Sequence, residues 1–425
     1  MRSQSGPASG KRIFYGWFIA ISGFFMVFTA LGFGSNSRSL YLTVITEDLG
    51  VSRSLFSLGD SIRYLTTAFV NIFFGALVAK YGARRLIGFG FLSLAASMAI
   101  YAMATHVVMF YIGGCLLGLG LAWTTTTIVG HLVENWFASS KGTIMGVILA
   151  ASGLGGAISS QVISRLIYME SRIAGWRISY MVTAVLMLTV GLITVLVIRN
   201  RPQDMGLTPQ TIGVGGKKKV RGEQWEGISF EEARRKPYFY VALACIFVTG
   251  FVLQSNYGVA SAHMRDSGID PAAVANVWSS LSLLLMVAKM SMGFIYDRVG
   301  LRKTLLLAFG CACVGILQLA FVSSVATAYV YSVFTAFALP LETVALPLIT
   351  RELFGSRSYS KIMGLVVSVN TLGYAAGVPI MNLFFDIVGS YTAIMVVMAG
   401  VMVCNAVAIQ MVIGAAHKDR AAATE

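Results

Sequence analysis

Five ionisable side chains lie inside long apolar stretches of this 425-residue chain: Arg38, Asp60, Arg63, Lys289 and Glu342. A charge that faced lipid at mid-depth would cost roughly 2.5 to 3.5 kcal/mol, so each group is expected to face a cavity or a partner. Three cations against two carboxylates leave an excess of positive charge. Such a lining favours a small organic anion as the ligand.

Lys289 is the central candidate among these groups. It lies between Ser279 and Ile295, a stretch with no other charge. With a helical rise of about 1.5 Å per residue it stands roughly 12 Å from Asp297, too deep for a side chain that only reaches the membrane surface. We predict that its ammonium group binds an anionic ligand. The alternative is a buried salt bridge with Glu342.

Asp60 and Arg63 form a second candidate pair, three residues apart on one face of a helix. The planar donors of Arg63 suit a carboxylate. An internal ion pair with Asp60 is equally compatible with this spacing. Arg38 stands near the outer end of the first apolar stretch, where it either binds the ligand or reaches the membrane interface.

Glu342 lies within ALPLETVALP, where two prolines loosen the helix. It is predicted to be either the proton carrier of a symport cycle or the counter-ion of Lys289. Polar neighbours on several stretches offer further hydrogen bonds and an aromatic wall to a ligand: Gln254, Asn256, Tyr257, Trp123, Asn370 and Tyr374. The alternative for each is that it merely joins neighbouring helices.

The composition identifies the elements that must hold these groups. Hydrophobic residues make up 56% of the chain and charged residues 12%, and the mean hydropathy is +0.76. Apolar stretches of about 20 residues, long enough to cross a bilayer, recur nearly end to end. Without period-two alternation they are read as helices. The chain is therefore an all-α, polytopic membrane protein.

Twelve transmembrane helices are predicted from the apolar runs and the charged or Gly/Pro breaks between them. The first can continue toward Thr46, because no strong breaker follows Gly34. The predicted spans lie near 14–35, 54–79, 86–104, 111–134, 142–164, 178–198, 239–262, 272–295, 304–322, 326–349, 361–385 and 390–413.

A long polar segment divides the spans into six and six. We predict an N-terminal half at 1–198, a cytoplasmic linker at 199–237 and a C-terminal half at 238–425. The linker contains Pro209, glycines within 213–216 and three lysines at 217–219. Near its end Ser229 and Glu232 have the spacing of a capping box, which predicts a short surface helix.

The net charge of +14 is read as a topology signal rather than as a nucleic-acid footprint, because the basic residues lie in short loops between spans. With both termini inside, the only basic residues in the outer loops are Arg53, Arg165, Arg172, Arg177 and Arg265. The positive-inside rule then predicts cytoplasmic termini and a location in the inner (plasma) membrane.

A motif recurs in the two halves, after the second span of each. One copy has Gly293, Asp297, Arg298, Gly300, Arg302 and Lys303; the other has Gly75, Lys80, Gly82, Arg84 and Arg85. Basic loops that only set topology would explain the charges but not the glycine spacing. The repetition indicates two parallel repeats, as in large transporter folds.

On these residues the chain resembles the major facilitator superfamily over essentially its whole length. The resemblance implies a cytoplasmic gate at both motif copies, in which a carboxylate and arginines bridge helices in one conformation. The second copy matches the superfamily signature fully. The first has Ala79 where the aspartate belongs, so gating by the N-terminal half is expected to differ.

A narrower resemblance comes from FYGWF, ENWFASSKGTIMG, GWRISY and NRPQDMGLTP, which are similar to the monocarboxylate porter and oxalate/formate antiporter branches. MVAKMSMG is similar to the eighth span of monocarboxylate porters, with Lys289 where they have a substrate-binding arginine. Leu285 stands where that family has an aspartate coupled to protons. The missing aspartate weighs against the family's usual proton mechanism.

These observations together predict a secondary transporter of small organic anions, mono- or dicarboxylates, whose halves rock about a midplane site. Coupling is proton symport or anion exchange, and a single chain is expected to suffice. The competing hypotheses are a proton-coupled exporter of drug-like or cationic compounds that uses Glu342, and a transporter-like sensor or scaffold. We expect no enzymatic constellation, cofactor or metal site, and the five cysteines are expected to be buried, reduced thiols.

Overall fold

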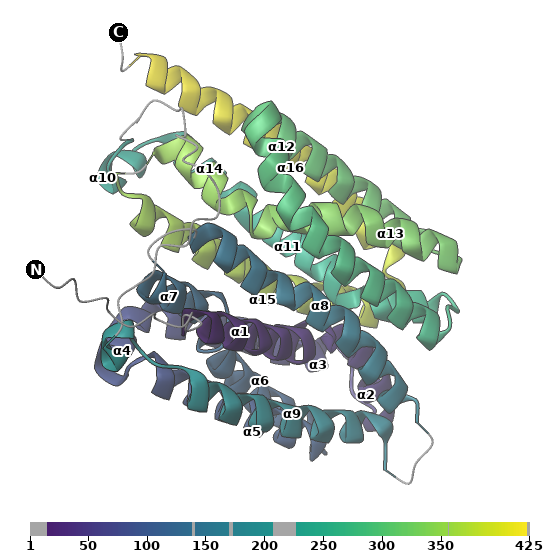
Figure 1. Ribbon diagram of the computed structural model, residues 1–425. Helices are drawn as coiled ribbons and strands as arrows, with labels where there is room; N and C mark the ends of the chain where they lie inside the picture. Colours follow the sequence, from purple (N-terminus) through teal and green to yellow (C-terminus); the bar gives the residue numbers. More distant parts are fainter. Residues whose placement is uncertain (1–14, 138–140, 170–172, 207–226, 356, 423–425) are drawn as a thin grey trace, which may run out of the picture.

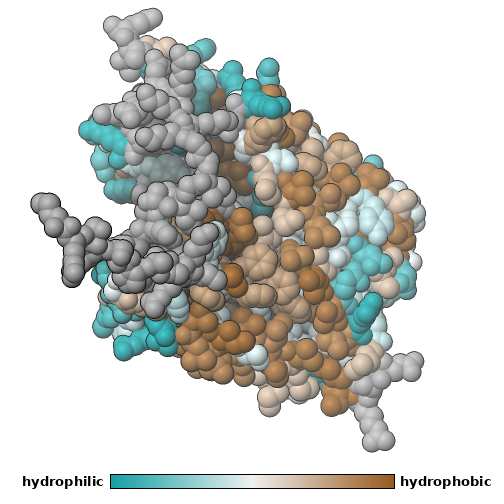
Figure 2. All heavy atoms as spheres, in the orientation of Figure 1, coloured by the Kyte–Doolittle hydropathy of each residue, from teal (hydrophilic) through white to brown (hydrophobic). Residues whose placement is uncertain are grey.

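The computed structural model describes residues 15–137, 141–169, 173–206, 227–355 and 357–422. Within these ranges the chain forms helices and no strand (Figure 1). Eleven helices are long and apolar enough to cross a membrane, and one bent pair raises the total to twelve. This agrees with the twelve predicted spans. On the face in Figure 2, apolar side chains cover the middle and hydrophilic ones gather toward the left and right ends.

The first span is longer than its predicted core and continues past Gly34. It comprises α1 (Gly16–Val27), the π-helix η1 (Phe28–Asn36), the 3₁₀ turn η2 (Arg38–Tyr41) and α2 (Leu42–Leu49). Gly50 ends it in a left-handed conformation, with φ of 63°. The predicted continuation toward Thr46 is thus confirmed.

The other helices of the N-half, which we define as α1 to α9, include two interrupted spans. The predicted span 54–79 bends by 64° between α3 and α4, and the predicted span 111–134 is broken at Trp123 to Thr125. The helices are α3 (Arg53–Ile72), α4 (Phe74–Tyr81), α5 (Ala83–Ala102), α6 (Val107–Ala122), α7 (Thr126–Trp136), α8 (Lys141–Ile167) and α9 (Gly175–Val197).

The C-half, α11 to α16, has related interruptions. Gly300 departs from helical geometry, with φ of 79°, and separates the two spans within α12. Around Pro340 the predicted span 326–349 narrows into a 3₁₀ turn. The helices are α11 (Pro237–Asp266), α12 (Pro271–Ala320), α13 (Val325–Ala338), η4 (Leu339–Glu342), α14 (Ala345–Phe354), α15 (Tyr359–Val388) and α16 (Thr392–Ala422).

Two short helices lie between the halves: η3 (Pro202–Met205) and α10 (Phe230–Ala233). The predicted capping box at α10 is confirmed: Ser229 Oγ accepts from the Glu232 amide, and the Glu232 carboxylate accepts from the Ser229 amide. These bonds hold the pKa of Glu232 below its ordinary value. The predicted linker features at 209, 213–216 and 217–219 lie outside the described residues.

Three glycines of α8, Gly153, Gly155 and Gly156, let this helix pack closely on its neighbours. A Cβ on Gly155 would lie 2.3 Å from the carbonyl oxygen of Phe28 in η1. A Cβ on Gly153 would lie 2.7 Å from the carbonyl oxygen of Ser282, so α8 also packs closely on α12 of the other half. Gly146 of the same helix makes no such close approach, since no atom lies within 4 Å of its Cβ position.

The cysteines require a partial correction. All five are free thiols within helices, but Cys115 and Cys404 are exposed on the protein surface rather than buried. Both lie on apolar helices with outward faces, where lipid covers side chains that would be solvent-exposed in a soluble protein. Cys245 is buried as expected.

Candidate functional site

Three charged side chains of the N-half converge in one place, and we call Arg38, Asp60 and Arg63 the arginine cluster. Asp60 Oδ1 lies 2.7 Å from Arg38 Nε and 3.2 Å from Arg63 Nε. Arg38 and Arg63 are 8% and 5% exposed. The internal ion pair left open by the sequence is therefore present, and it is shared between two arginines.

Local structure explains how the cluster is assembled. Asp60 and Arg63 are one helical turn apart in α3. Gly114 and Gly118 of α6 let α3 approach closely, because a Cβ on either would lie 2.5 or 2.3 Å from an α3 carbonyl oxygen. Arg38 enters from the 3₁₀ turn η2.

Arg38 does not reach the membrane interface, so that alternative is wrong. Its Nη1 donates to the Tyr101 hydroxyl at 3.0 Å, and its guanidinium carbon lies 5.1 Å from the Tyr101 ring centroid. The bond to Tyr101 and the ion pair with Asp60 draw the side chain inward. Arg38 is thereby committed to the interior of the N-half.

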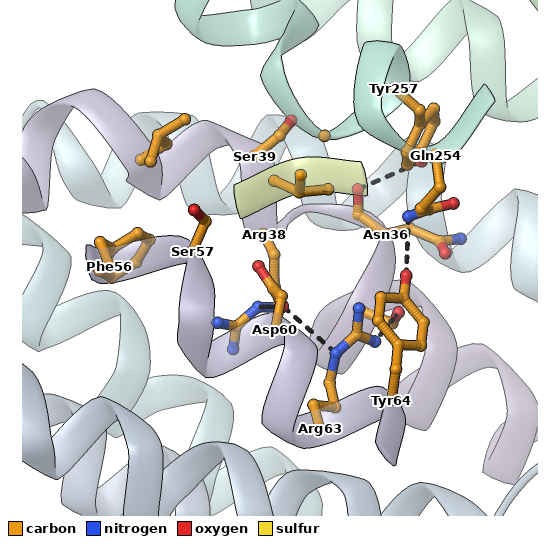
Figure 3. Close-up of a pocket in the computed structure, with 14 residues that line it drawn as sticks. Asn36, Arg38, Ser39, Phe56, Ser57, Asp60, Arg63, Tyr64, Gln254 and Tyr257 are labelled. Atoms are coloured by element: carbon orange, nitrogen blue, oxygen red, sulfur yellow. Dashed lines mark hydrogen bonds and ion pairs between the residues drawn. The ribbon is translucent and has the colours of Figure 1, made fainter. Parts of the chain in front are cut away.

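The cluster borders a small cavity between the two halves (Figure 3). The cavity has about 460 Å³ of unfilled space, including the part open to solvent. The predicted residues Arg38, Asp60, Arg63, Gln254 and Tyr257 all line it. The remaining lining residues are Ser35, Asn36, Ser39, Leu42, Phe56, Ser57, Tyr64, Gly258 and Val378.

Hydrogen bonds across the halves frame this cavity. Gln254 Nε2 donates to the Tyr64 hydroxyl at 2.7 Å. The carbonyl oxygen of Asn36, at the end of η1, accepts from Trp278 Nε1 at 2.9 Å and from the Tyr257 hydroxyl at 3.4 Å. The π-helical turn leaves this carbonyl free of a regular helical partner. Tyr64 and Asn36 were missed, although Tyr64 directly follows the singled-out Arg63.

Lys289 and Glu342 lie apart from the cavity lining. Among the side chains that the structure describes, no carboxylate lies within 4.0 Å of Lys289 Nζ, so the salt bridge with Glu342, the alternative to a ligand role, is not formed. The two groups are still close enough for electrostatic interaction. Glu342 is 8% exposed, and its Oε1 has no hydrogen-bond partner.

Tyrosines connect the two charged regions. The rings of Tyr64 and Tyr374 have centroids 5.3 Å apart, and Tyr64 interacts electrostatically with both Asp60 and Glu342. Tyr374 accepts a 2.7 Å hydrogen bond from Asn370. Asn370 and Tyr374 thus stand beside Glu342 rather than in the cavity.

Two other predicted residues are engaged in packing. Trp123 is 2% exposed and stacks on Phe74 with ring centroids 5.4 Å apart. Asn256 Nδ2 donates to the Val252 carbonyl at 2.7 Å. Neither residue lines the cavity, and a substrate contact for them remains a prediction.

The repeated motif shapes the two inter-helix turns. Gly82 and Gly300 have φ of 77° and 79°, a region in which glycine is favoured. Arg84 Nε donates to the Val195 carbonyl at 2.7 Å, and Gln410 donates to the Arg302 carbonyl at 2.9 Å. Each contact stays within its own half.

The other motif residues make no bond that reaches across the halves among the described side chains. Arg298 stacks on Phe294 at 4.0 Å, and the side chain of Asp297 lies outside the described set. No atom lies within 4 Å of a Cβ placed on Gly75 or Gly293. The exposed basic side chains of the motif are Lys80, Arg85, Arg298, Arg302 and Lys303. Their role as a gate remains a prediction.

The end of the molecule away from the motif loops is tied together by a charged group that we call the latch: Arg53, Asp266 and Asp386. Arg53 makes two bonds to Asp266, of 2.5 and 2.8 Å. Asp386 accepts from the backbone amides of Arg53 and Ser54 at 3.3 and 3.0 Å. The latch joins α3 of the N-half to α11 and α15 of the C-half, away from the start of α1 and the end of α16 (Figure 1).

Comparison with known proteins gives a consistent picture. The model of the Major Facilitator Superfamily matches residues 18–260 and 242–425. The chain is 26% identical over 407 residues to monocarboxylate transporter 13 of Bos taurus, covering 93% of this chain and 88% of the relative. It is 19% identical over 327 residues to the sialic acid transporter NanX of Escherichia coli (strain K12), covering 75% and 73%.

Solved structures show the same fold. A bacterial homolog of the human lysosomal transporter Spinster, in an inward-facing and unoccupied conformation, superposes with a TM-score of 0.76 at 13% identity, covering 97% of this chain and 99% of that one. The nucleoside transporter NupG gives 0.74 at 12% identity, covering 94% and 99%.

Proposed function

The chain belongs to the major facilitator superfamily, and from that premise we propose that it is a secondary active transporter of small organic anions, mono- or dicarboxylates, working by alternating access. Coupling is to protons or to a counter-moving anion. The observation that carries this proposal is the arginine cluster: two buried guanidinium groups with one carboxylate between them, beside a cavity between the halves.

The chemistry of the cluster supports an anionic substrate. Arg63 Nη1 donates a hydrogen bond to the Ser35 hydroxyl at 2.8 Å, and its guanidinium carbon lies 4.0 Å from the centroid of the Tyr64 ring. An arginine fixed in this way is ready to receive a carboxylate without further ordering. Lys289 adds a third cation, on the C-half, without a carboxylate within 4.0 Å among the described side chains. The names of the two relatives, a monocarboxylate and a sialic acid transporter, agree with such a substrate.

For topology we propose the predicted boundaries of 1–198, 199–237 and 238–425, with cytoplasmic termini and a location in the inner (plasma) membrane. The distribution of basic loop residues supports this orientation. With this orientation the latch closes the outside end. Transport requires that latch to open while the motif loops close the inside end.

Flux measurements test the proposed function directly. Purified protein in liposomes is given a panel of labelled carboxylates, with an acid-outside pH gradient or with unlabelled anion inside. We expect saturable uptake of at least one carboxylate under one of these conditions. If no carboxylate moves and a cationic dye is expelled instead, the exporter hypothesis based on the unpartnered Glu342 oxygen replaces this one.

Replacing Glu342 by glutamine separates proton coupling from binding. A glutamine cannot carry a proton, so we expect the stimulation of uptake by the pH gradient to fall by about tenfold or more. Anion exchange is expected to continue. The measurement is labelled uptake at two outside pH values. If both pH dependence and exchange rate stay at wild-type values, Glu342 is neither the proton carrier nor the counter-ion of Lys289.

Replacing Arg53 by alanine is expected to open the outside end more often. The change removes the bonds to Asp266 and the contact of Arg53 with the Phe385 ring at 4.1 Å. The readout is labelling of Ser39→Cys, a cavity residue, by an impermeant thiol reagent in a background without native cysteines. We expect labelling from outside to rise about tenfold, as for a loss of about 1.4 kcal/mol.

Arg177→Ala is the matched control for the latch. Arg177 has the same charge at the same end, but its bond to the Ala102 carbonyl and its contact with Trp176 stay within the N-half. Labelling in this variant is expected to match the wild type. Equal labelling rates in the Arg53 and Arg177 variants would refute the latch.

A further inference from the structure

We infer that the cavity selects a monovalent anion and that Asp60 sets this valence. The inference rests on the proposed function and deepens it, because the proposal above leaves mono- and dicarboxylates open. Its physical basis is the charge of the cavity lining and the way in which one carboxylate oxygen is shared between two arginines.

Counting charges at the site gives a single positive excess. In the arginine cluster, two guanidinium groups stand against one carboxylate. Lys289 and Glu342 lie apart from the cavity lining, so the sum is taken over the charged side chains that line the cavity. The cavity lining therefore has one positive charge without a built-in counter-charge among the described residues.

The arginine cluster also has hydrogen-bond donors without partners. The Nε atoms of Arg38 and Arg63 lie at ion-pair distance from Asp60 Oδ1, but their N–H groups are not aligned for hydrogen bonds to it. Arg38 Nη2 is buried and has no hydrogen-bond partner. A second carboxylate can thus enter and satisfy donors that Asp60 leaves unused.

The valence follows from the cost of buried charge. A singly charged anion cancels the excess and leaves the closed site neutral. A doubly charged anion leaves one uncompensated negative charge in a region of low dielectric, which is strongly unfavourable. Asp60 is 18% exposed on its side chain and faces this cavity, so it occupies a place that a second substrate carboxylate would otherwise take. In effect the protein supplies one of the two carboxylates itself.

Replacing Asp60 by asparagine tests this inference, because the change keeps the shape and raises the site charge by one. The readout is the ratio of propionate to succinate uptake in the same proteoliposome preparation, so that loss of folded protein cancels. We expect the wild type to prefer propionate by at least about tenfold, and the variant to shift the ratio toward succinate by at least about tenfold. Asp60→Glu keeps the charge and is expected to keep the wild-type preference.

The outcomes separate this inference from the proposed function. Transport of carboxylates with the same ratio in wild type and Asp60→Asn, or a wild-type preference for succinate, overturns the valence assignment alone. Absence of any carboxylate transport by the wild type overturns both. If Asp60→Asn is inactive toward both probes, the double variant Asp60→Asn/Arg38→Gln restores the original charge and must regain propionate uptake; failure to do so also overturns the assignment.

Discussion

Replacement of Arg63 by alanine is expected to abolish transport of the anionic substrate. The change removes the planar donors that hold a carboxylate and leaves Asp60 with only Arg38 at 2.7 Å. Truncating one partner of a buried charged pair costs about 2 to 5 kcal/mol, which corresponds to about 30- to 4,000-fold in affinity. The measurement is the initial rate of labelled carboxylate uptake over a range of concentrations.

Two comparisons define the result for Arg63. Arg63→Lys keeps the charge but loses the paired donors, so it is expected to lie between alanine and wild type. Arg234→Ala removes an arginine that is 55% exposed and paired only with Glu231, and its transport is expected to be normal. An Arg63→Ala protein that is monodisperse and transports at the wild-type KM would exclude Arg63 as a substrate ligand.

The second large effect concerns folding. Gly155→Val is expected to prevent assembly of the N-half, because its Cβ would collide with the Phe28 carbonyl oxygen at 2.3 Å. The obstacle is backbone on both sides: a Cβ on Gly32 of η1 would lie 2.5 Å from the carbonyl carbon of Gly155. Neither helix can yield by rotating a side chain, so the cost is roughly 3 kcal/mol or more. The yield of monodisperse protein and its melting temperature report this loss.

Gly146→Val on the same helix is the control. It adds the same side chain at a position with no atom within 4 Å of the Cβ site. We expect its yield and melting temperature to stay close to wild type. If the two valine variants behave alike, the proximity of α8 and η1 does not limit stability.

The number and approximate positions of the spans could be predicted because they depend on composition over about 20 residues. Their interruptions could not. The break at Trp123 to Thr125 contains neither proline nor glycine, and the π-helical stretch at Phe28–Asn36 follows the α-helix before it without a proline or a charged residue between them. These features depend on contacts with neighbouring helices, such as the approach of Gly32 to Gly155.

The candidate site was predictable as a set of charges but not as an arrangement. A single Asp60 oxygen shared by two arginines depends on where η2 meets α3, and no spacing in the sequence encodes that meeting. Lys289 was ranked first from its depth in the membrane, whereas the described cavity is lined by Arg38, Asp60 and Arg63 and not by Lys289. A backbone acceptor such as the Asn36 carbonyl has no signature in the side-chain sequence at all.

The first turn of α3 has an unusual capping arrangement whose consequence is a built-in reporter of motion. Ser52 caps the amide of Leu55 from within the same half, but the amides of Arg53 and Ser54 are capped by Asp386 of the other half. Whenever the halves separate at this end, those two amides pass to water. Their hydrogen–deuterium exchange therefore records how often the carrier opens, without any label, and the neighbouring Leu55 amide serves as the internal reference.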